Sequence, residues 1–515
     1  MSSIFTKDFK SKLIQDFIAD VANTNSASSK YYVALGRTDE WPVENSPTTA
    51  TSDLQSYSYQ LFNNMLAGKR VASSDVSFMI ENYTWDDGGN TVYDFYSHLD
   101  ADLQNKQFFV ITSSRRIYKC LFNNYGLPST IEPTSTSTTG IYQTSDGYLW
   151  KYMGQISKVT YDKFTTVDYV PAVIDTDVKS AAINGSLDVI VVSNNGNNYV
   201  NIINQGVIEQ VVNTKTYKIA NSGSSSADSY YNNSAFYISA GPGINQLTTI
   251  NSYQVNTSGK YVTTDNALSS ITGQSKFTIA PQVVITGDGV SASAYAVVNT
   301  STYTVSSIQV VNRGSKYTFA TASIVANSLY GSDATAYPII SPPYGHGFDI
   351  LTELGCDTLG ISVDFDSSVN TIPYFIDYRQ VGLLYNPLIY GKLPGTGTAN
   401  VYSSNTFVQQ LQIQLNSART SGTFTIEETV KGSVSKATGI VKYANTSYLM
   451  VANTTGSFVV NESISGLTST ALGTISELNN IDLQPNSGKV LYYRNIQDIQ
   501  RTETSKETVK LYIKF

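Results

Sequence analysis

The sequence GTFTIEETVKGSVSKATGIV at residues 422–441 returns in altered form as GSFVVNESISGLTSTALGTI at residues 456–475, 34 residues further on. The matched positions are Gly422 and Gly456, Phe424 and Phe458, Glu428 and Glu462, Val430 and Ile464, Gly432 and Gly466, Ser435 and Ser469, Ala437 and Ala471, Gly439 and Gly473, and Val441 and Ile475. Small residues at every second position, bounded by glycines, are typical of short strands and tight turns. The repeat therefore predicts a small all-β module of two related halves at residues 420–478.

A second, looser repeat lies earlier in the chain. Residues 190–199 and 308–317 share Ile, Val, Asn, Gly and Tyr at matching positions, 118 residues apart, and residues 253–261 resemble a degenerate third copy. Segments in which glycine and alanine alternate with other residues follow, and this period of two again favours strands. We therefore predict one or two inserted β domains within residues 179–339.

The remaining segments are predicted to form one parent fold that the chain leaves twice and re-enters. The predicted division is 1–178 (an N-terminal helix plus β), 179–339 (inserted β repeats), 340–419, 420–478 (the two-copy module) and 479–515 (ending in a strand). The expected fold class is mainly β and multi-domain, with antiparallel or sandwich-like sheets. A chain of 515 residues is long enough for several cores.

Residues 4–22 give the clearest helical pattern. Phe5, Phe9, Leu13 and Phe17 recur at every fourth position, which places them in one apolar stripe. The stripe either packs on its own domain or docks on a neighbouring subunit, and the sequence leaves both readings open.

Strands are predicted at residues 31–35, 108–112 and 117–121, with a turn at 113–116, and an exposed loop at 129–146. The end of the chain alternates strictly from Val509 to Phe515, so we expect it to finish as a strand with one apolar face.

Composition limits the function. Hydrophobic residues make up 41% of the chain and charged residues only 14%, against a usual charged fraction of about 25%. There are 37 tyrosines. Few charges and many tyrosines suit a chain that works inside an assembly, although a β-rich protein with ordinary strand tyrosines is the alternative. The net charge of −7 and the lack of a basic patch argue against nucleic acid as the main partner.

Cysteine usage and hydropathy set further expectations. Cys120 and Cys356 lie far apart and in no C-x-x-C pattern, so they are predicted to be free buried thiols. The first residues lack a signal-peptide pattern, and no stretch approaches the roughly 18 apolar residues of a membrane span. We expect a product made in a cytoplasm, with no membrane partner.

Candidate catalytic and metal-ligating residues are few. The two histidines, His98 and His346, are far apart, and His346 in the sequence Gly-His-Gly-Phe-Asp is better explained as a turn histidine bonded to backbone than as a metal ligand or general base. Asp86 and Asp87, before two glycines, indicate a turn rather than a glycosidase pair. Asp288 lacks the neighbours of a calcium loop. We therefore predict no catalytic, cofactor or metal site.

Candidate interface residues are aromatic or lie beside aromatic residues. They are Phe5, Phe9, Leu13 and Phe17 of the first helix, the pair Arg37 and Trp41, and the group Tyr148, Trp150 and Tyr152. Each of them could belong to the core instead, and the sequence does not decide between the two readings.

Six short blocks outside the inserted repeats are similar, in the same order, to the baseplate wedge subunit of T-even-like contractile-tailed bacteriophages that forms a homodimer within each wedge. The blocks are 32–42, 117–121, 145–152, 345–347 with 353–355, 378–388, and 487–495 followed by the last strand. Together they span both ends and about half of the chain. Residues 179–339 and 420–478 depart from the pattern, because the familiar relative is much shorter.

The resemblance implies an architectural role. Members of the family join other wedge proteins around a central hub, and the baseplate they form couples host contact to sheath contraction. We accordingly expect a structural virion protein of the tail baseplate, with a second copy and other wedge proteins as partners, no enzymatic activity and no cofactor. Two alternatives stay open: a receptor-binding or fibre-like tail protein that contacts host glycans, and a polysaccharide-degrading tail enzyme.

Overall fold

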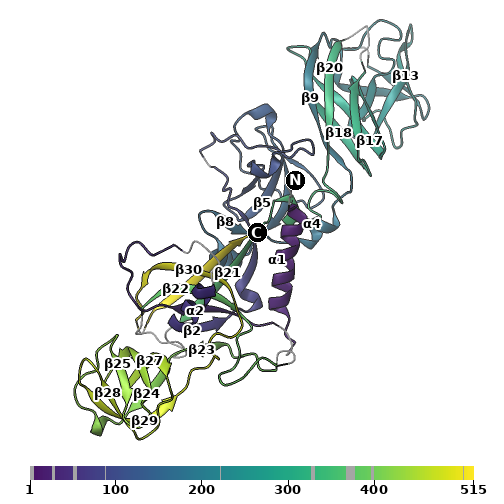
Figure 1. Ribbon diagram of the computed structural model, residues 1–515. Helices are drawn as coiled ribbons and strands as arrows, with labels where there is room; N and C mark the ends of the chain where they lie inside the picture. The colour runs from purple at the N-terminus through teal and green to yellow at the C-terminus, as the bar shows by residue number, and fades with distance from the viewer. Residues whose placement is uncertain are drawn as a thin grey trace, which may run out of the picture. The chain divides into compact units, whose positions relative to one another are not determined.

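The computed structural model describes residues 5–25, 29–49, 55–86, 88–220, 222–325, 331–366, 377–395, 399–502 and 504–515. It is mainly β, with 45% of residues in strands and 11% in helices, arranged in several antiparallel sheets and barrels (Figure 1). This confirms the predicted fold class.

The chain forms two compact units, which we describe separately. Unit 1 is Met1–Met79 together with Asp357–Phe515, and unit 2 is Ile80–Cys356. The predicted segment 1–178 thus contributes to both units, and the five-segment division as such stays a prediction.

A five-stranded sheet forms the centre of unit 1. Its strands, in spatial order, are β23 (Thr406–Val408), β2 (Met65–Arg70), β1 (Tyr31–Gly36), β22 (Tyr378–Tyr385) and β30 (Lys489–Ile499). β1 and nearly all of β22 are buried on both faces, which explains the continuous apolar sequence of β1 and of β22 from Val381 onward. Helix α2 (Gln55–Asn64) packs Leu61 on the sheet beside Gly382, where an added Cβ would lie 2.6 Å from the leucine side chain.

A second sheet of unit 1 holds the end of the chain. In it, β21 (Thr358–Asp366) lies between β31 (Lys506–Lys514) and β3 (Val76–Glu81). The predicted terminal strand is therefore confirmed. Its alternation buries Val509 and Leu511 on one face.

Helix α1 (Lys7–Ala22) is the N-terminal helix that the sequence predicts. The hydroxyl of Thr6 caps it by accepting the N–H of Phe9 at 3.3 Å, and Asp8 places a negative charge in the first turn, where it suits the helix dipole. The helix buries Ser11, Ile14 and Val21.

The two-copy repeat folds into a closed six-stranded barrel in unit 1. Its strands, in order, are β24 (Leu411–Leu415), β27 (Tyr448–Thr455), β26 (Thr438–Ala444), β25 (Thr429–Gly432), β28 (Ser463–Gly466) and β29 (Leu472–Asn479). The first copy supplies β25 and β26, the second supplies β28 and β29, and β25 pairs with β28 across the copies. The matched apolar residues of both copies meet in one core: Phe424, Phe458, Val430, Ile464, Ala437, Ala471, Val441 and Ile475.

A glutamate of each copy binds a turn of the other copy. The carboxylate of Glu462 accepts the N–H of Ser435 at 2.9 Å and its hydroxyl at 2.7 Å. Glu428 binds Ser469 in the same way, at 2.9 Å and 2.6 Å. A Cβ at Gly432 would lie 2.7 Å from the Glu462 carboxylate, so this position has no room for a side chain. Glutamate, serine and glycine therefore repeat because each copy completes the other.

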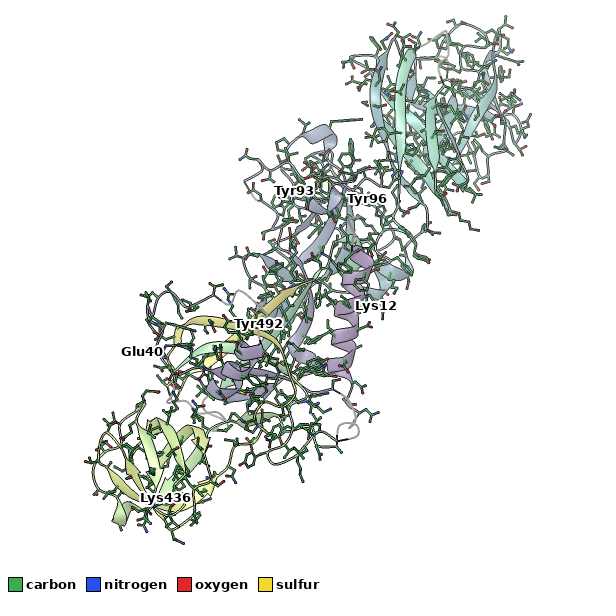
Figure 2. The ribbon with its side chains drawn as sticks, in the orientation of Figure 1. Lys12, Glu40, Tyr93, Tyr96, Lys436 and Tyr492 are labelled. Atoms are coloured by element: carbon green, nitrogen blue, oxygen red, sulfur yellow. The ribbon has the colours of Figure 1, made fainter. Side chains whose placement is uncertain are left out.

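In unit 2, a four-stranded sheet carries an aromatic core. Its strands, in order, are β4 (Phe109–Ile111), β5 (Arg116–Phe122), β7 (Leu149–Gln155) and β6 (Tyr142–Gln143). Tyr148 and Trp150 are fully buried and stack with ring centroids 5.4 Å apart, and Tyr93 (Figure 2) meets Trp150 edge-on. The sequence predicts β4 and β5, whereas the segment 129–146, predicted as a loop, also contains β6.

The segment of unit 2 from β9 to β20 forms a closed barrel and a six-stranded sheet with a shared hydrophobic core. The barrel strands, in order, are β10 (Ile203–Val211), β11 (Thr216–Ile219), β14 (Gly259–Thr264), β13 (Leu247–Asn256), β12 (Ala235–Ala240) and β15 (Lys276–Ala280). The sheet strands, in order, are β18 (Thr304–Ser315), β17 (Val290–Asn299), β16 (Gln282–Gly287), β19 (Ala320–Ile324), β20 (Ser332–Ile340) and β9 (Leu187–Asn197). Leu187 pairs with Ile340, so the segment starts and ends at neighbouring positions.

Short elements complete unit 2. They are α3 (Lys158–Phe164), β8 (Tyr169–Pro171), α4 (Thr176–Ser180) and α5 (Ile350–Glu353). The carboxylate of Asp349 caps α5 by accepting the N–H of Thr352, which fixes the turn that presents Glu353. Cys120 and Cys356 are buried thiols outside any disulfide, as predicted.

Replacing Glu462 by alanine is expected to destabilise the protein by about 3 kcal/mol, because three backbone N–H groups and one hydroxyl lose a charged acceptor. Burial alone would raise the pKa of Glu462, but hydrogen bonds from Ser435 and from neighbouring backbone outweigh it and lower the pKa. The stabilisation is therefore present above about pH 4.3 and is lost as the pH falls through the lowered pKa.

Urea unfolding of the full-length protein at pH 7 and at pH 3 measures this effect. Glu477→Ala, at an exposed glutamate of β29, is the control and is expected to change stability by less than about 0.5 kcal/mol. Equal losses in the two variants at pH 7 would contradict the role given to the Glu462 carboxylate.

Candidate functional site

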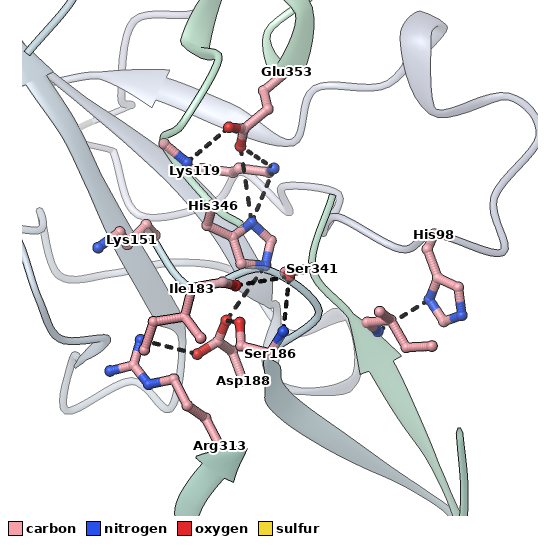
Figure 3. Close-up of polar contacts among 12 residues, drawn as sticks. His98, Lys119, Lys151, Ile183, Ser186, Asp188, Arg313, Ser341, His346 and Glu353 are labelled. Atoms are coloured by element: carbon pink, nitrogen blue, oxygen red, sulfur yellow. Dashed lines mark hydrogen bonds and ion pairs between the residues drawn. The ribbon is translucent and has the colours of Figure 1, made fainter. Parts of the chain in front are cut away.

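A group of buried and partly buried charged residues lies inside unit 2, where five elements and one turn meet (Figure 3). β5 contributes Lys119, β7 contributes Lys151, β9 contributes Asp188, β18 contributes Arg313, the turn after β20 contributes His346, and α5 contributes Glu353. We call these six residues the buried charge cluster.

Lys119 is the centre of the cluster. Its side chain is wholly buried, and its ammonium nitrogen lies 2.8 Å from Glu353 Oε2 and 3.1 Å from His346 Nδ1. The same nitrogen lies 3.9 Å from the centre of the Tyr96 ring, a cation–π distance. Burial lowers the pKa of Lys119, and the Glu353 carboxylate opposes that shift by stabilising the charged form.

The geometry fixes the tautomer of His346. Because an ammonium group only donates, Nδ1 of the ring accepts from Lys119, and the ring proton lies on Nε2, 3.7 Å from Asp188 Oδ2. Burial, followed by the charges of Lys119, Lys151 and Arg313, holds the pKa of His346 well below its ordinary value. The imidazole is therefore neutral at pH 7.

Asp188 extends the cluster to β18. Its Oδ2 accepts the hydroxyl of Ser186 at 2.5 Å, and its Oδ1 lies 3.3 Å from the Arg313 guanidinium. Arg313 also donates to the carbonyl of Thr139 at 2.8 Å. Two carboxylates thus face Lys119 and Arg313, with a neutral imidazole between the pairs, so these four charges balance.

Lys151 supplies a further positive charge at the edge of the cluster. Its ammonium group donates to the carbonyl of Thr138 at 2.5 Å. Burial, with a smaller effect of Arg313, lowers the pKa of Lys151 to about 8. The side chain is buried, so this amine is not exposed to solvent as a reactive lysine would be.

The cluster does not have the geometry of a catalytic centre. The cavity beside His346, Asp188 and Lys151 measures about 10 Å³, which is close to the space of one water molecule. The hydroxyl of Ser341 donates to the carbonyl of Ile183 at 3.4 Å and accepts the N–H of Ser186, so it is not aimed at the imidazole as a nucleophile would be. Across the described residues, no group of three or more His, Cys, Asp or Glu side chains could hold a metal ion.

The arrangement links strands and a helix that are far apart in the sequence. One ion pair joins β5 to α5, a second joins β9 to β18, and the His346 ring lies between the two pairs. A buried pair of this kind contributes little net stability compared with apolar packing, but losing one partner leaves an uncompensated charge. It therefore fixes which strands meet more than it adds to the total stability.

The other residues considered as sites have structural partners. His98 Nδ1 accepts the N–H of Ile340 at 3.1 Å, and burial lowers the pKa of His98. Asp86 accepts the N–H of Gly88 at 2.9 Å within a turn, whereas Asp87 lies outside the described residues. Asp288 accepts the N–H of Thr318 at 2.9 Å and its hydroxyl at 2.5 Å, so its carboxylate holds a loop.

The hypothesis for His346 needs a correction. The residue does lie in a turn, but its ring nitrogens face Lys119 and Asp188 rather than backbone groups. Sequence reasoning also missed Lys119, Asp188 and Glu353. A signal for Lys119 existed: it is a single charge inside the apolar run 117–121, where an unpaired lysine would be costly.

The predicted interface residues of α1 divide between two environments. Phe5, Phe9 and Leu13 are exposed by 69%, 48% and 38%, and the rings of Phe5 and Phe9 stack with centroids 5.4 Å apart. Phe17 instead packs on Tyr31, with ring centroids 4.6 Å apart. The stripe is therefore open to solvent over its first three residues only.

The other interface candidates serve the fold. The guanidinium of Arg37 lies 3.8 Å from the centre of the Trp41 ring, and the Trp41 indole donates to the carbonyl of Ile496 at 2.8 Å. Tyr148, Trp150 and Tyr152 are buried in the aromatic core of the β4–β7 sheet, so they offer no surface to a partner.

A larger cavity of unit 2, of about 450 Å³, lies beside β9 and β18. Its walls include Phe122, Tyr125 and Ile308. Its charged residues, Asp188 and Arg313, are already paired with each other. The cavity therefore has no charge preference that would identify a ligand.

No protein-family model matches the chain, and no curated protein matches it either. Over the described residues, none of the helices has the length and apolar character that crossing a membrane requires.

Replacing Lys119 by methionine is expected to destabilise unit 2 by about 3–5 kcal/mol, because Glu353 is left buried without its cation. The double variant Lys119→Met/Glu353→Gln removes both charges and is expected to recover part of that loss. Urea unfolding followed by tryptophan fluorescence, to which Trp41, Trp85 and Trp150 all contribute, measures both variants.

The matched control is Lys158→Met, which removes a lysine 2.5 Å from Asp162 in an exposed ion pair. It is expected to cost less than about 1 kcal/mol. A loss at Lys119 no larger than this control would show that the cluster does not hold the fold.

Acid is expected to weaken unit 2 through His346. Lys119, Lys151, Arg313, Asp188 and Glu353 surround the ring from every side, and the folded state resists adding a charge there. The unfolded chain takes up a proton below about pH 6.5, so stability is full above that pH and falls as the pH is lowered, by at most about 1.4 kcal/mol per unit.

Unfolding free energies of the native protein and of His346→Gln, measured at pH 7.5 and pH 5.5, separate this contribution from that of His98. The native protein is expected to lose about 1 kcal/mol more than the variant. An equal pH dependence of the two proteins would refute the assignment.

Proposed function

We propose that this chain is a structural subunit of a contractile-tail baseplate wedge, which joins neighbouring wedge proteins and takes part in baseplate assembly and in the rearrangement that triggers contraction. Its place is then the virion, after assembly in a host cytoplasm. Its partners are a second copy and other wedge proteins, with neither nucleic acid nor membrane among them. No catalytic activity belongs to this proposal.

The observation that carries the proposal is where the resembling blocks lie. Blocks 32–42, 378–388 and 487–495, far apart in sequence, supply the neighbouring strands β1, β22 and β30. Blocks 117–121 and 145–152 supply the paired strands β5 and β7.

The remaining block, 345–347 with 353–355, provides His346 and Glu353, the partners of Lys119 in the buried charge cluster. Segments that are far apart in the sequence thus form neighbouring strands in two sheets. This distribution supports a common fold beneath the resemblance, with the repeats as additions to it.

The surface of unit 1 supports an assembly role. Phe5, just before α1, and Phe9, in its first turn, are both exposed, and their rings stack on each other. Isolated exposed apolar residues are ordinary, whereas exposed aromatic residues side by side are typical of contact surfaces. The buried charge cluster agrees with an architectural protein, because it braces strands and has no room for a substrate.

Light scattering of the purified chain on a sizing column tests the dimer in this proposal. The expected mass is twice the 56.1 kDa of one chain. A stable trimer would instead favour the fibre-like alternative that contacts host glycans, since such proteins are usually trimeric.

Electron microscopy of tailed particles, labelled with gold-conjugated antibody against this chain, tests its location. The label is expected at the baseplate end of the tail, because a wedge subunit is part of the finished baseplate. Label along fibres, or particles without label, would reject the wedge assignment.

A further inference from the structure

The larger cavity of unit 2 has the size of a small-molecule site. Its volume of about 450 Å³ lies within the range of about 300–1,000 Å³ that is usual for such sites. Its lining residues come from four stretches of the chain, at 122–125, 140–149, 188–190 and 307–313. The chemistry of this lining indicates which class of ligand fits.

Two aromatic rings line the cavity in fixed positions. The rings of Phe122 and Tyr125 are perpendicular, with centroids 4.9 Å apart. Tyr125 is 51% exposed, so its ring is accessible to a ligand. Its hydroxyl donates to the carbonyl of Ser306 at 3.3 Å, which ties the ring to the start of β18.

The backbone that carries Tyr125 is strained. In the short turn η3 (Asn124–Gly126), Asn124 and Tyr125 both have left-handed conformations, with φ of 48° and 59°. The side chain of Asn123 accepts the N–H of Gly126 at 3.2 Å and so holds the turn. Left-handed residues other than glycine cost free energy, and they are concentrated at ligand sites.

Polar groups without a protein partner also line the cavity. Within the described part of the chain, the amide of Gln143 and the hydroxyl of Ser307 make no hydrogen bond. The side chain of Asp188 is 5% exposed, and its Oδ1 has no hydrogen bond from the described residues, although the Arg313 guanidinium lies 3.3 Å away (Figure 3). A buried carboxylate oxygen normally has a donor, and a ligand hydroxyl can supply one.

The charges of the cavity cancel. Among the described residues that line it, Asp188 and Arg313 are the ionised ones, and they pair with each other. A charged ligand therefore finds no unpaired counter-charge there. A wholly apolar ligand is disfavoured too, because it covers Gln143 and Asp188 without giving them hydrogen bonds. The lining thus favours a neutral ligand with an apolar face and several groups that donate and accept.

We propose that this cavity binds a neutral saccharide unit. One face of a pyranose ring consists mainly of C–H groups, which pack on an aromatic ring such as that of Tyr125. The hydroxyls of the sugar both donate and accept, which suits the amide of Gln143 and the adjacent Asp188 carboxylate and Arg313 guanidinium. This site goes beyond the proposed wedge role and does not depend on it.

Saturation-transfer-difference NMR on the full-length protein tests the site with the methyl glycosides of glucose, galactose and mannose. At least one of them is expected to receive saturation, most strongly at the C–H protons of one ring face. The corresponding uronic acid is expected to bind at least about tenfold more weakly, because its carboxylate loses water and gains no free cation.

Tyr125→Ala is expected to weaken binding of that glycoside by about tenfold, because it removes the aromatic contact. Gln143→Ala is expected to weaken it by about threefold. The matched control is Tyr303→Ala, at a tyrosine that is 48% exposed, has a φ of 56° and lies outside the lining. It is expected to bind normally, and circular dichroism shows whether each variant keeps its sheets.

Absence of saturation in all three glycosides would overturn the inference. Equal losses in Tyr125→Ala and Tyr303→Ala would overturn it as well, because the sugar would then bind elsewhere. Adenosine is a further probe: if it binds and no glycoside does, the cavity takes a flat aromatic ligand instead. A chain found in the baseplate that binds no glycoside rejects the saccharide site alone, whereas a chain that binds one but is absent from tails rejects the wedge role.

Discussion

A charged side chain that folding removes from water is stable only when partner groups surround it. The buried parts of this structure depend on such partners. In unit 2, the ammonium group of Lys119 lies in a fully buried position, and Glu353, His346 and the Tyr96 ring surround it. Those partners come from sequence positions more than 200 residues away from Lys119 in two of the three cases. The strands must therefore meet in one arrangement, since any other leaves a carboxylate or an ammonium group alone.

The barrel of unit 1 meets the same need with backbone donors in place of cations. Glu428 and Glu462 are nearly buried, and each accepts N–H groups from a turn of the other repeat copy. Each carboxylate accepts one N–H from its own copy and its remaining hydrogen bonds from the other copy, so the two halves complete each other. This explains why the repeat keeps the glutamate, serine and glycine that make contacts between the two halves. An exposed position such as Ile426 differs between the copies.

Much of the fold could be predicted from local pattern. Period-two alternation and glycine spacing are properties of strands and turns themselves, so the mainly β class, α1 and the terminal strand follow from the sequence. The buried charge cluster could not be found in this way, because its members pair across long separations and each one alone looks like an ordinary surface residue. The stripe on α1 shows a third limit: periodicity predicts that Phe5, Phe9 and Leu13 share a face, but only the packed helix shows that Ser11 and Ile14 point inward instead.

The two barrel-containing segments begin and end at neighbouring positions, which is what the predicted insertions into a parent fold require. Leu187 pairs with Ile340 at the base of one module, and Gln412 pairs with Asn479 at the base of the other. Each module thus begins and ends at adjacent positions. The distance that the flanking strands must bridge is therefore short, whatever the length of the insert. Loop closure costs only about 0.6 kcal/mol for each doubling of loop length. Pairing of β22 with β30 therefore survives the intervening barrel, and modules of this kind can change a protein's surface without changing the sheets that hold it together.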